Sequence, residues 1–434
     1  MSIKFFLRLS MTRNFSGPGW AKVVSIVVMF LTTGFSLPAV SAPDYAITRV
    51  SRLNLKQQPQ AKSQTIRMLG KGSHVTIVNR HDSRGWVQVA LPDGSEGWTQ
   101  EKYLRHYQPQ PNLDKQHSTG SEYTSYLEQA VFGFIEKNKL NGAGKDQLQL
   151  MVQDLETGQI LVSVKAQEQV KAASLIKVPV LHAYMLEWYR GHITHTDSLY
   201  RHLKNMINLS SNFSTNHILK TLGGPEHVSE LLRNTGLYNH LKLVEYIPAG
   251  GRTYQNKISA SDLNRLFARI WKKRILGSGF SQEDNQQASE FMLSLLGIEG
   301  HRHSRDRLKD GTCFEQFDSV KIWDKTGFVR GLNGNSGIIE IDTPQGRKAY
   351  SVVSIIDRED YWRIRGGGNR WAAVQSYRMR RISEMIYAWF MNQHHGFEAC
   401  GRNELVKYAT HTIDLKTRSQ FSYMDPAKME KSAF

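Results

Sequence analysis

The sequence predicts an α+β fold, in which an antiparallel sheet is flanked by helices and preceded by a small all-β barrel. In residues 46–107, short runs of alternating apolar residues are separated by turn sequences, which is typical of a small barrel. In residues 123–391, predicted strands at both ends enclose several predicted helices, which indicates a sheet covered by helices. Residues 108–122 are polar and contain Gln-Pro-Gln-Pro, so we expect a linker between the two regions.

The composition is that of a globular protein with room for two domains. Of the 434 residues, 40% are hydrophobic and 22% are charged, so a sizeable core is expected. The formal net charge of +17 favours an anionic partner, although a dispersed solubilising charge is the alternative. Zinc-finger spacing, an RNA-binding signature and a dense Lys/Arg block are all lacking in the sequence. We therefore predict no nucleic-acid partner.

Residues 1–42 have the pattern of an export signal. A long basic start precedes the apolar stretch from Val23 to Val40, and small residues at its end offer cleavage sites. Polar residues, glycine and proline interrupt the apolar stretch, which favours a cleaved signal over an uncleaved membrane anchor. Either outcome predicts a mature protein outside the cytoplasm, in the periplasm or the extracellular space.

The first module is predicted from two alternating runs, Val75–Val78 and Trp86–Val89, with glycine-containing turns around them. Its landmarks Leu53-Asn54-Leu55, Gly72 and Gly97-Trp98 resemble those of a bacterial SH3 domain. The resemblance implies that residues 46–107 bind the cell wall or a peptide. The alternative for Trp86 and Trp98 is that they are only core residues of the module.

The large domain is predicted to begin with a helix at 125–138 and strands at 148–153 and 160–164. It is predicted to end with strands at 337–341 and 349–356 and a helix at 371–390. Leu148, Leu150 and Val152 alternate with period two, which is the basis of the first strand. The segment 394–434 is polar and is expected to be a poorly ordered tail.

The strongest chemical signal is Ser174-Leu175-Ile176-Lys177, followed by apolar residues. A serine hydroxyl is a poor nucleophile until a base accepts its proton. Three residues are nearly one helical turn, so Lys177 is expected on the same face as Ser174. Burial of Lys177 would disfavour its charged form and make a neutral, basic amine accessible. We therefore expect Ser174 to be the nucleophile and Lys177 its proton acceptor.

Two further motifs follow in chain order, Ser210-Ser211-Asn212 and Lys325-Thr326-Gly327. S-x-x-K, S-D-N and K-T-G together mark class A β-lactamases and penicillin-binding proteins. The domain at 123–391 therefore resembles the class A β-lactamase family of serine hydrolases.

The resemblance implies a role for each matching residue. Ser174 would be acylated, Ser210 would pass a proton to the leaving nitrogen, and Lys325 and Thr326 would bind the substrate carboxylate. The backbone N–H groups of Ser174 and Phe328 would form the oxyanion hole. The remaining substrate-binding residues implied by the motifs are Asn212, Asn216 and Gly327. Arg330, just beyond K-T-G, could help hold a carboxylate, or it could be an exposed edge charge.

Two departures from the family pattern bear on the chemistry. Ser211 replaces the aspartate of S-D-N. Class A enzymes also place a glutamate, followed by x-x-L-N, where it activates the deacylating water. Glu245 stands at about the right distance after Ser210, but the residues after it lack the asparagine. Glu245 is thus a candidate base, and a solvated loop residue is the alternative.

The sequence predicts no cofactor and no metal. Cys313 and Cys400 have no C-x-x-C spacing, and His394-His395 lacks a helical H-x-x-x-H pair with a glutamate. In an oxidising compartment the two cysteines could pair.

Three functions are compatible with these residues. The first is a β-lactamase, which needs fast hydrolysis of the acyl-enzyme and hence a working Glu245. The second is a peptidoglycan peptidase that acts on D-Ala-D-Ala stem peptides, because a β-lactam mimics that substrate. The third is a non-catalytic cell-wall binding protein, which would be expected to lose Ser174, Lys177 or K-T-G. All three elements are present, so an enzyme is favoured. The sequence does not predict an oligomeric state.

Overall fold

A computed structural model of the protein describes residues 43–81, 84–116, 125–248, 250–298, 306–364 and 367–410. The predicted export signal at 1–42 lies outside these residues. In the part of the chain that is described, no helix combines the length and the apolar character needed to cross a membrane.

The first module is all-β, as predicted. One antiparallel sheet has the strand order β3-β2-β6-β5-β4-β1-β7 and surrounds its own core, which includes Leu55, Val87 and Val89. Trp86 is buried, which agrees with its interpretation as a core residue. The strands are β1 (Asp44–Thr48), β2 (Leu53–Lys56), β3 (Thr65–Leu69), β4 (His74–His81), β5 (Trp86–Ala90), β6 (Glu96–Gln100) and β7 (Leu104–Tyr107), with a 3-10 turn η1 (Glu101–Tyr103) before β7.

The large domain is built on a five-stranded antiparallel sheet with the order β12-β13-β14-β8-β9. Its strands are β8 (Gln147–Asp154), β9 (Ile160–Val164), β12 (Val320–Val329), β13 (Leu332–Thr343) and β14 (Gly346–Asp357). β12 is an edge strand, and its register pairs Lys325 with Ser336 and Thr326 with Asn335 of β13. A short second sheet pairs β10 (Val170–Lys171) with β11 (Lys257–Ile258). The predicted antiparallel sheet flanked by helices is confirmed.

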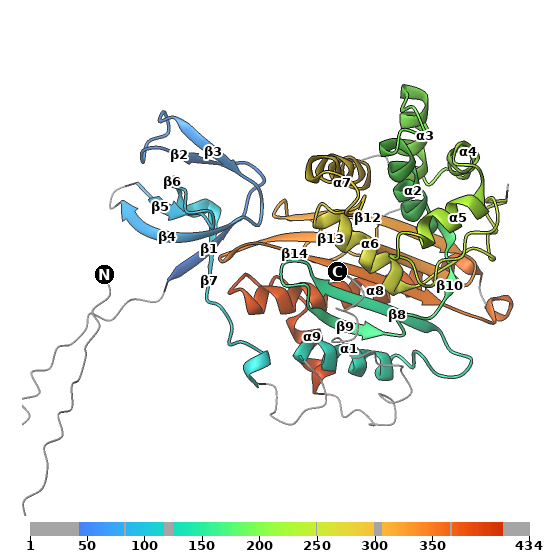
Figure 1. Ribbon diagram of the computed structural model, residues 1–434. Helices are drawn as coiled ribbons and strands as arrows, with labels where there is room; N and C mark the ends of the chain where they lie inside the picture. The colour runs from blue at the N-terminus through green and yellow to red at the C-terminus, as the bar shows by residue number, and fades with distance from the viewer. Residues whose placement is uncertain are drawn as a thin grey trace, which may run out of the picture. The chain divides into compact units, whose positions relative to one another are not determined.

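Helices cover both faces of this sheet (Figure 1). The group on one face is α2 (Lys177–Tyr189), α3 (Asp197–Ile207), α4 (Asn212–Thr221), α5 (Pro225–Arg233), α6 (Ala260–Trp271) and α7 (Gln282–Leu296). The group on the other face is α1 (Tyr126–Lys137), α8 (Gly368–Gln393) and α9 (Arg402–Ala409). Met151 belongs to one core, whereas its neighbours Leu150 and Val152 belong to the other. This alternation follows from the period of two along a strand.

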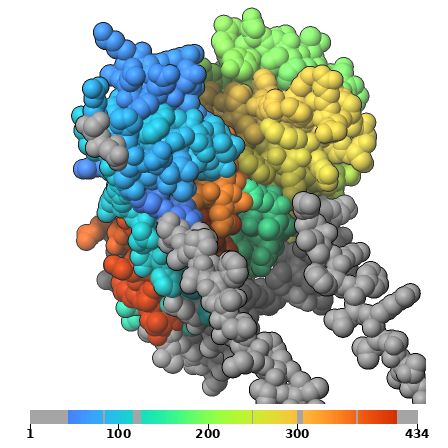
Figure 2. Space-filling view, turned by 90° about the vertical axis from the view of Figure 1, so that its left-hand side faces the viewer, coloured from blue at the N-terminus to red at the C-terminus, as the bar shows by residue number. Residues whose placement is uncertain are grey.

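Helix α2 is buried along most of its length. It contacts α3, α4, α5 and α7, so its sequence is apolar on almost every side. The outer surface of this helical layer is seen in Figure 2, where the yellow atoms of the α7 region lie beside the green atoms of the α3 region. Because α2 begins at Lys177, the Ser174-Leu175-Ile176-Lys177 motif leads directly into this buried helix.

Two connecting segments contain more packed structure than the sequence suggests. The predicted linker packs against the large domain at Leu113, which is buried and whose backbone N–H donates to Asn392 Oδ1 at 2.7 Å. A 3-10 turn, η2 (Asp114–Gln116), follows it. The predicted polar tail contains helix α9, which buries Leu405 and Tyr408 in the same core. Tail residues 411–434 and linker residues 117–124 lie outside the described part of the chain.

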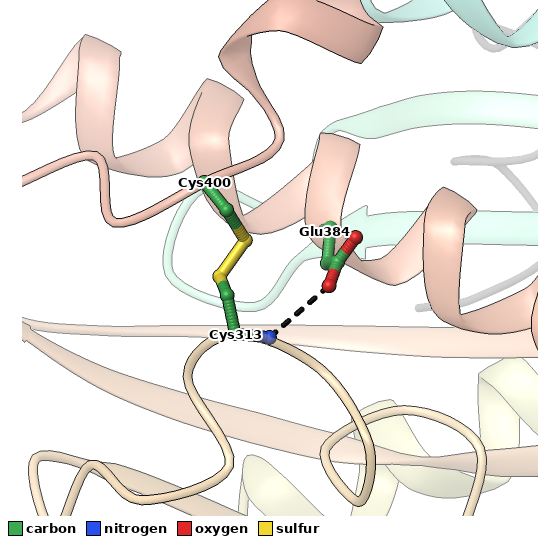
Figure 3. A group of neighbouring side chains, drawn as sticks. All are labelled: Cys313, Glu384 and Cys400. Carbon is green, nitrogen blue, oxygen red and sulfur yellow. Dashed lines mark hydrogen bonds between the residues drawn. A yellow bond between two sulfur atoms is a disulfide. The ribbon is translucent and has the colours of Figure 1, made fainter.

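A disulfide joins Cys313, in the loop before β12, to Cys400, just before α9 (Figure 3). The Cα atoms are 6.1 Å apart and the residues are separated by 87 positions. Glu384 of α8 lies beside the bond and accepts a hydrogen bond from the Cys313 backbone N–H at 3.1 Å. The pairing that the sequence left open is therefore formed, and it attaches α9 to the loop that leads into β12.

Candidate active site

Ser174 lies in a 3-10 turn, η3 (Ala173–Ile176), that runs directly into α2. The preceding residue, Ala173, has a φ of 45° and is buried, so the chain turns sharply to present the serine. Leu175 packs against the edge of the sheet. A Cβ atom on Gly327 would lie 2.7 Å from Leu175 Cγ, so β12 approaches η3 this closely only with glycine there.

Lys177 makes the contact that the motif predicts. Its Nζ atom lies 2.7 Å from Ser174 Oγ and 3.0 Å from Asn212 Oδ1. The lysine is 0% exposed. The structure thus brings Ser174, Lys177 and Asn212 into one hydrogen-bonded group.

The environment of Lys177 favours a neutral amine. Burial lowers the pKa of Lys177 well below its ordinary value of 10.5, and the positive charge of Lys325 lowers it further. A neutral amine at 2.7 Å from a hydroxyl oxygen can accept the hydroxyl proton. The arrangement can therefore generate a serine alkoxide.

The Ser210-Ser211-Asn212 motif forms the start of α4. Ser210 has a φ of 54° and lines the same cavity as Ser174. Ser211 is the N-cap of α4, and its side chain accepts a hydrogen bond from the Ser214 backbone N–H at 3.2 Å. Serine and aspartate are both good N-cap residues, so the replacement of aspartate at this position keeps the cap.

Lys325, Thr326 and Gly327 lie on the edge strand β12. Lys325 is buried, and its Nζ donates to the Thr326 carbonyl oxygen at 3.0 Å. Thr326, Phe328 and Arg330 are spaced by two residues and all line the cavity. Thr326 of the motif and the residues that follow the motif therefore form one wall of the cavity that contains Ser174.

The cavity has a volume of about 890 Å³. The described residues that line it include the polar and aromatic side chains Ser174, Ser210, Asn212, Arg252, Thr253, Tyr254, Arg307, Thr326, Phe328, Arg330, Tyr361, Asn369 and Ser376. None of the described lining residues is an aspartate or a glutamate. The site is therefore cationic and suits an anionic substrate.

Glu245 is not brought to this cavity. Its Oε1 atom accepts hydrogen bonds from Thr253 Oγ1 at 2.9 Å and from the backbone N–H groups of Tyr254 at 3.2 Å and Gln255 at 3.1 Å. The buried Asn256 side chain fastens the Glu245 backbone to the same loop. Glu245 therefore holds the loop at 253–256 together, and its carboxylate is absent from the described cavity wall.

Asn216 also has a different position from the predicted one. Its Nδ2 donates to the Ile247 carbonyl oxygen, and its Oδ1 accepts from the Ile247 backbone N–H, both at 2.8 Å. Because this pair occupies the side-chain amide, Asn216 fastens the loop after Glu245 to α4. It is not among the described lining residues of the cavity, and its substrate contact stays a prediction.

The lining residues that sequence reasoning missed include two arginines and two tyrosines, namely Arg252, Arg307, Tyr254 and Tyr361. Tyr254 stacks on Tyr361 with ring centroids 5.1 Å apart and an interplanar angle of 12°. Arg307 is 8% exposed, and its Nη1 atom has no hydrogen-bond partner among the described residues. These residues belong to none of the sequence motifs, so no local pattern in the sequence indicates that they line the cavity.

The model of the Beta-lactamase enzyme family matches residues 135–202 and 194–390, which is more than half of the chain. This chain therefore belongs to the beta-lactamase enzyme family, and has the fold of the serine hydrolases of the class A and penicillin-binding type. Residues 51–105 match the bacterial SH3 domain. Both resemblances that the sequence predicts are thus confirmed.

Several solved structures are similar to the large domain. PBP-A has 20% sequence identity and a TM-score of 0.48, with 65% of this chain and 98% of that chain covered. A point mutant of PBP-A, as an acyl-enzyme complex with penicillin G, has 21% identity and a TM-score of 0.47, with 61% and 96% covered. A β-lactamase from Sphaerobacter thermophilus has 15% identity and a TM-score of 0.43, with 59% and 96% covered. A search of the curated proteins found no match.

Proposed function

We propose that this protein opens amide bonds of the β-lactam type through an acyl-enzyme on Ser174. The observation that carries the proposal is the 2.7 Å contact between Ser174 Oγ and the Nζ atom of Lys177, a lysine whose pKa burial lowers. A nucleophile and its base within hydrogen-bond reach are what acyl transfer to serine requires.

In the proposed acylation, Ser174 Oγ attacks the substrate carbonyl carbon as its proton moves to Lys177 Nζ. The carbonyl oxygen becomes an oxyanion, which the backbone N–H groups of Ser174 and Phe328 stabilise. When the intermediate collapses, the C–N bond breaks, Ser210 delivers a proton to the leaving nitrogen, and protonated Lys177 returns a proton to Ser210, so that both groups end in their starting states. Lys325 and Thr326 hold the carboxylate of the leaving part, and the Asn212 side chain binds the substrate amide.

The position of Glu245 favours slow deacylation. Hydrolysis of the acyl-enzyme needs a base within reach of the attacking water. Among the described residues, the cavity wall has no carboxylate to provide one, and Glu245 Oε1 is bound to Thr253, Tyr254 and Gln255. A long-lived adduct with a penicillin is the expected result, rather than the rapid turnover of an efficient β-lactamase.

Slow deacylation favours the second candidate function, a peptidoglycan D-Ala-D-Ala peptidase that β-lactams acylate. Such a peptidase would use Ser174, Lys177, Ser210 and Lys325 in the same roles. The bacterial SH3 domain at 51–105 and the net charge of +17 support a cell-wall substrate, which is an anionic mesh. Export through residues 1–42, to the periplasm or beyond, belongs to the same proposal.

Three measurements test the proposal. Labelling with a fluorescent penicillin should require Ser174 and Lys177, and labelling of Ser174→Ala would contradict the nucleophile. The full chain should sediment with purified peptidoglycan, and a chain that stays in solution would contradict cell-wall binding. Release of D-Ala from a D-Ala-D-Ala peptide distinguishes a peptidase from a protein that only binds β-lactams.

A further inference from the structure

The cavity has more positive charge than one substrate carboxylate requires. Lys325 lies behind its wall, and Arg252, Arg307 and Arg330 line it, whereas the described lining residues include no carboxylate. Asp306 and Asp324 act electrostatically on Arg307 from outside the lining. Among the described residues, no carboxylate is paired with Arg252 or Arg330, and exposed like charges on one cavity indicate an anionic ligand.

These charges lie at two ends of the cavity. Thr326 and Arg330 are both on β12 or at its end, four residues apart, which separates their Cα atoms by about 13 Å at the usual rise of a strand. Arg307 lies at the end of the cavity where Thr326 is. Its backbone N–H donates to Asn335 Oδ1 at 2.6 Å, and Asn335 is the register partner of Thr326. Leu175, next to the nucleophile, packs against Gly327, between the two ends.

Arg252 and Arg330 form the second end, together with Tyr254. Burial and the neighbouring Tyr361 raise the pKa of Tyr254, whereas the charges of Arg252 and Arg330 act on it in the lowering direction. Arg252, Tyr254 and Arg330 also line the same cavity, so two guanidinium groups from different segments share this end with one phenol. Across the described chain, neither arginine is paired with a carboxylate, and both are exposed.

We propose that Arg252 and Arg330 form a second anion subsite on the acyl side of the scissile bond, so that the preferred substrate has two carboxylates. This inference rests on the proposed function. If Lys325 and Thr326 bind the carboxylate of the leaving part, the end beyond Phe328 receives the acyl part. A carboxylate there would lie between two guanidinium groups beside the stacked pair of Tyr254 and Tyr361.

Penicillin G and carbenicillin are a matched pair of probes, because carbenicillin differs only by a carboxylate on the acyl side chain. The quantity to measure is the ratio of their second-order rate constants for acylation of Ser174 in the full chain. Arg252→Gln and Arg330→Gln should each lower the ratio of carbenicillin to penicillin G by about two- to five-fold relative to wild type, as expected for a solvent-accessible ion pair. In Arg252→Lys and Arg330→Lys, which keep the positive charge, the ratio of carbenicillin to penicillin G should stay close to that of wild type.

Arg363 provides the control for general electrostatic attraction. It is exposed in the 3-10 turn η4 (Tyr361–Arg363) but does not line the cavity. Arg363→Gln should leave the ratio unchanged, and high salt should reduce the wild-type ratio towards that of the glutamine variants.

The outcomes separate the two proposals. An equal ratio in wild type, Arg252→Gln and Arg330→Gln, with adducts formed in all three, would overturn the second subsite and leave the proposed function in place. An equal loss in Arg363→Gln would also overturn it, because the effect would then be general attraction. Failure of both penicillins to acylate wild type would overturn the proposed function and this inference with it.

Discussion

Lys177 Nζ lies 2.7 Å from Ser174 Oγ, and the same lysine is hydrogen-bonded to Asn212 Oδ1 at 3.0 Å. In the part of the chain that is described, these two partners are a hydroxyl and an amide oxygen, and neither is a carboxylate. The charged group that acts on the pKa of Lys177 is Lys325, which disfavours protonation. The base chemistry of the site is therefore that of a buried, uncompensated amine.

The pH dependence of acylation should report this amine. Because the pKa of Lys177 is lowered, the neutral base becomes populated as pH rises through a midpoint well below the ordinary lysine value of 10.5. The second-order rate constant for acylation by penicillin G, measured from pH 5 to pH 10, should rise through that midpoint. In Lys325→Gln the midpoint should move to higher pH, since a like charge is removed. A wild-type midpoint near 10.5 would contradict the assignment of Lys177 as the base.

Glu245 should act through the loop rather than through a water molecule. Glu245→Gln keeps an acceptor oxygen for Thr253, Tyr254 and Gln255, whereas Glu245→Ala removes it. Deacylation of the penicillin adduct should therefore be unchanged within about two-fold in Glu245→Gln, because no proton transfer is lost.

Glu245→Ala should increase amide hydrogen exchange in residues 250–256 and destabilise the protein by about 1 to 3 kcal/mol, as expected when three hydrogen bonds to a charged acceptor are lost. Both variants are compared by intact mass after the free drug is removed. If both variants deacylate more slowly than wild type by ten-fold or more, Glu245 is a general base and the slow-turnover account is wrong.

The disulfide should stabilise the fold more than it affects the chemistry. Cys313 and Cys400 are 87 positions apart, and for a loop of this length the loss of chain entropy in the unfolded state corresponds to about 4.6 kcal/mol. The Cys313→Ser/Cys400→Ser double variant should have a lower free energy of unfolding in urea by about 2 to 5 kcal/mol. Wild type in a reductant should shift towards the double variant, and the double variant itself should not respond. Unchanged stability in the double variant would contradict the pairing.

The sequence predicted elements well where local periodicity was strong. The strand at 160–164 has the predicted bounds, and the predicted helix at 125–138 is α1, capped by Ser125. The helix at 371–390 extends by a few residues at each end. The three motifs also predicted correctly that Ser174, Lys177, Ser210, Asn212 and Thr326 lie close together. The spacing within each motif is local, and the fold of the family positions the motifs relative to one another.

The sequence could not predict contacts that depend on tertiary packing. Glu245 stands at a suitable distance from Ser210 along the chain, but the donors of the loop at 253–255 determine where its carboxylate lies. Asn216 is similarly occupied by the Ile247 backbone. Helix α9 is short and polar, so it has little periodicity, and its position depends on packing against α1 and α8 and on the disulfide.

The most direct test of the account is intact mass over time after the protein is mixed with penicillin G, beside Ser174→Ala. The account predicts a stoichiometric adduct of the intact drug on wild type that persists after the free drug is removed, and no adduct on Ser174→Ala. An adduct on Ser174→Ala, or no adduct on wild type together with no loss of the drug, would contradict the claim that Ser174 is the acylated nucleophile. Rapid loss of the drug without a lasting adduct would contradict slow deacylation.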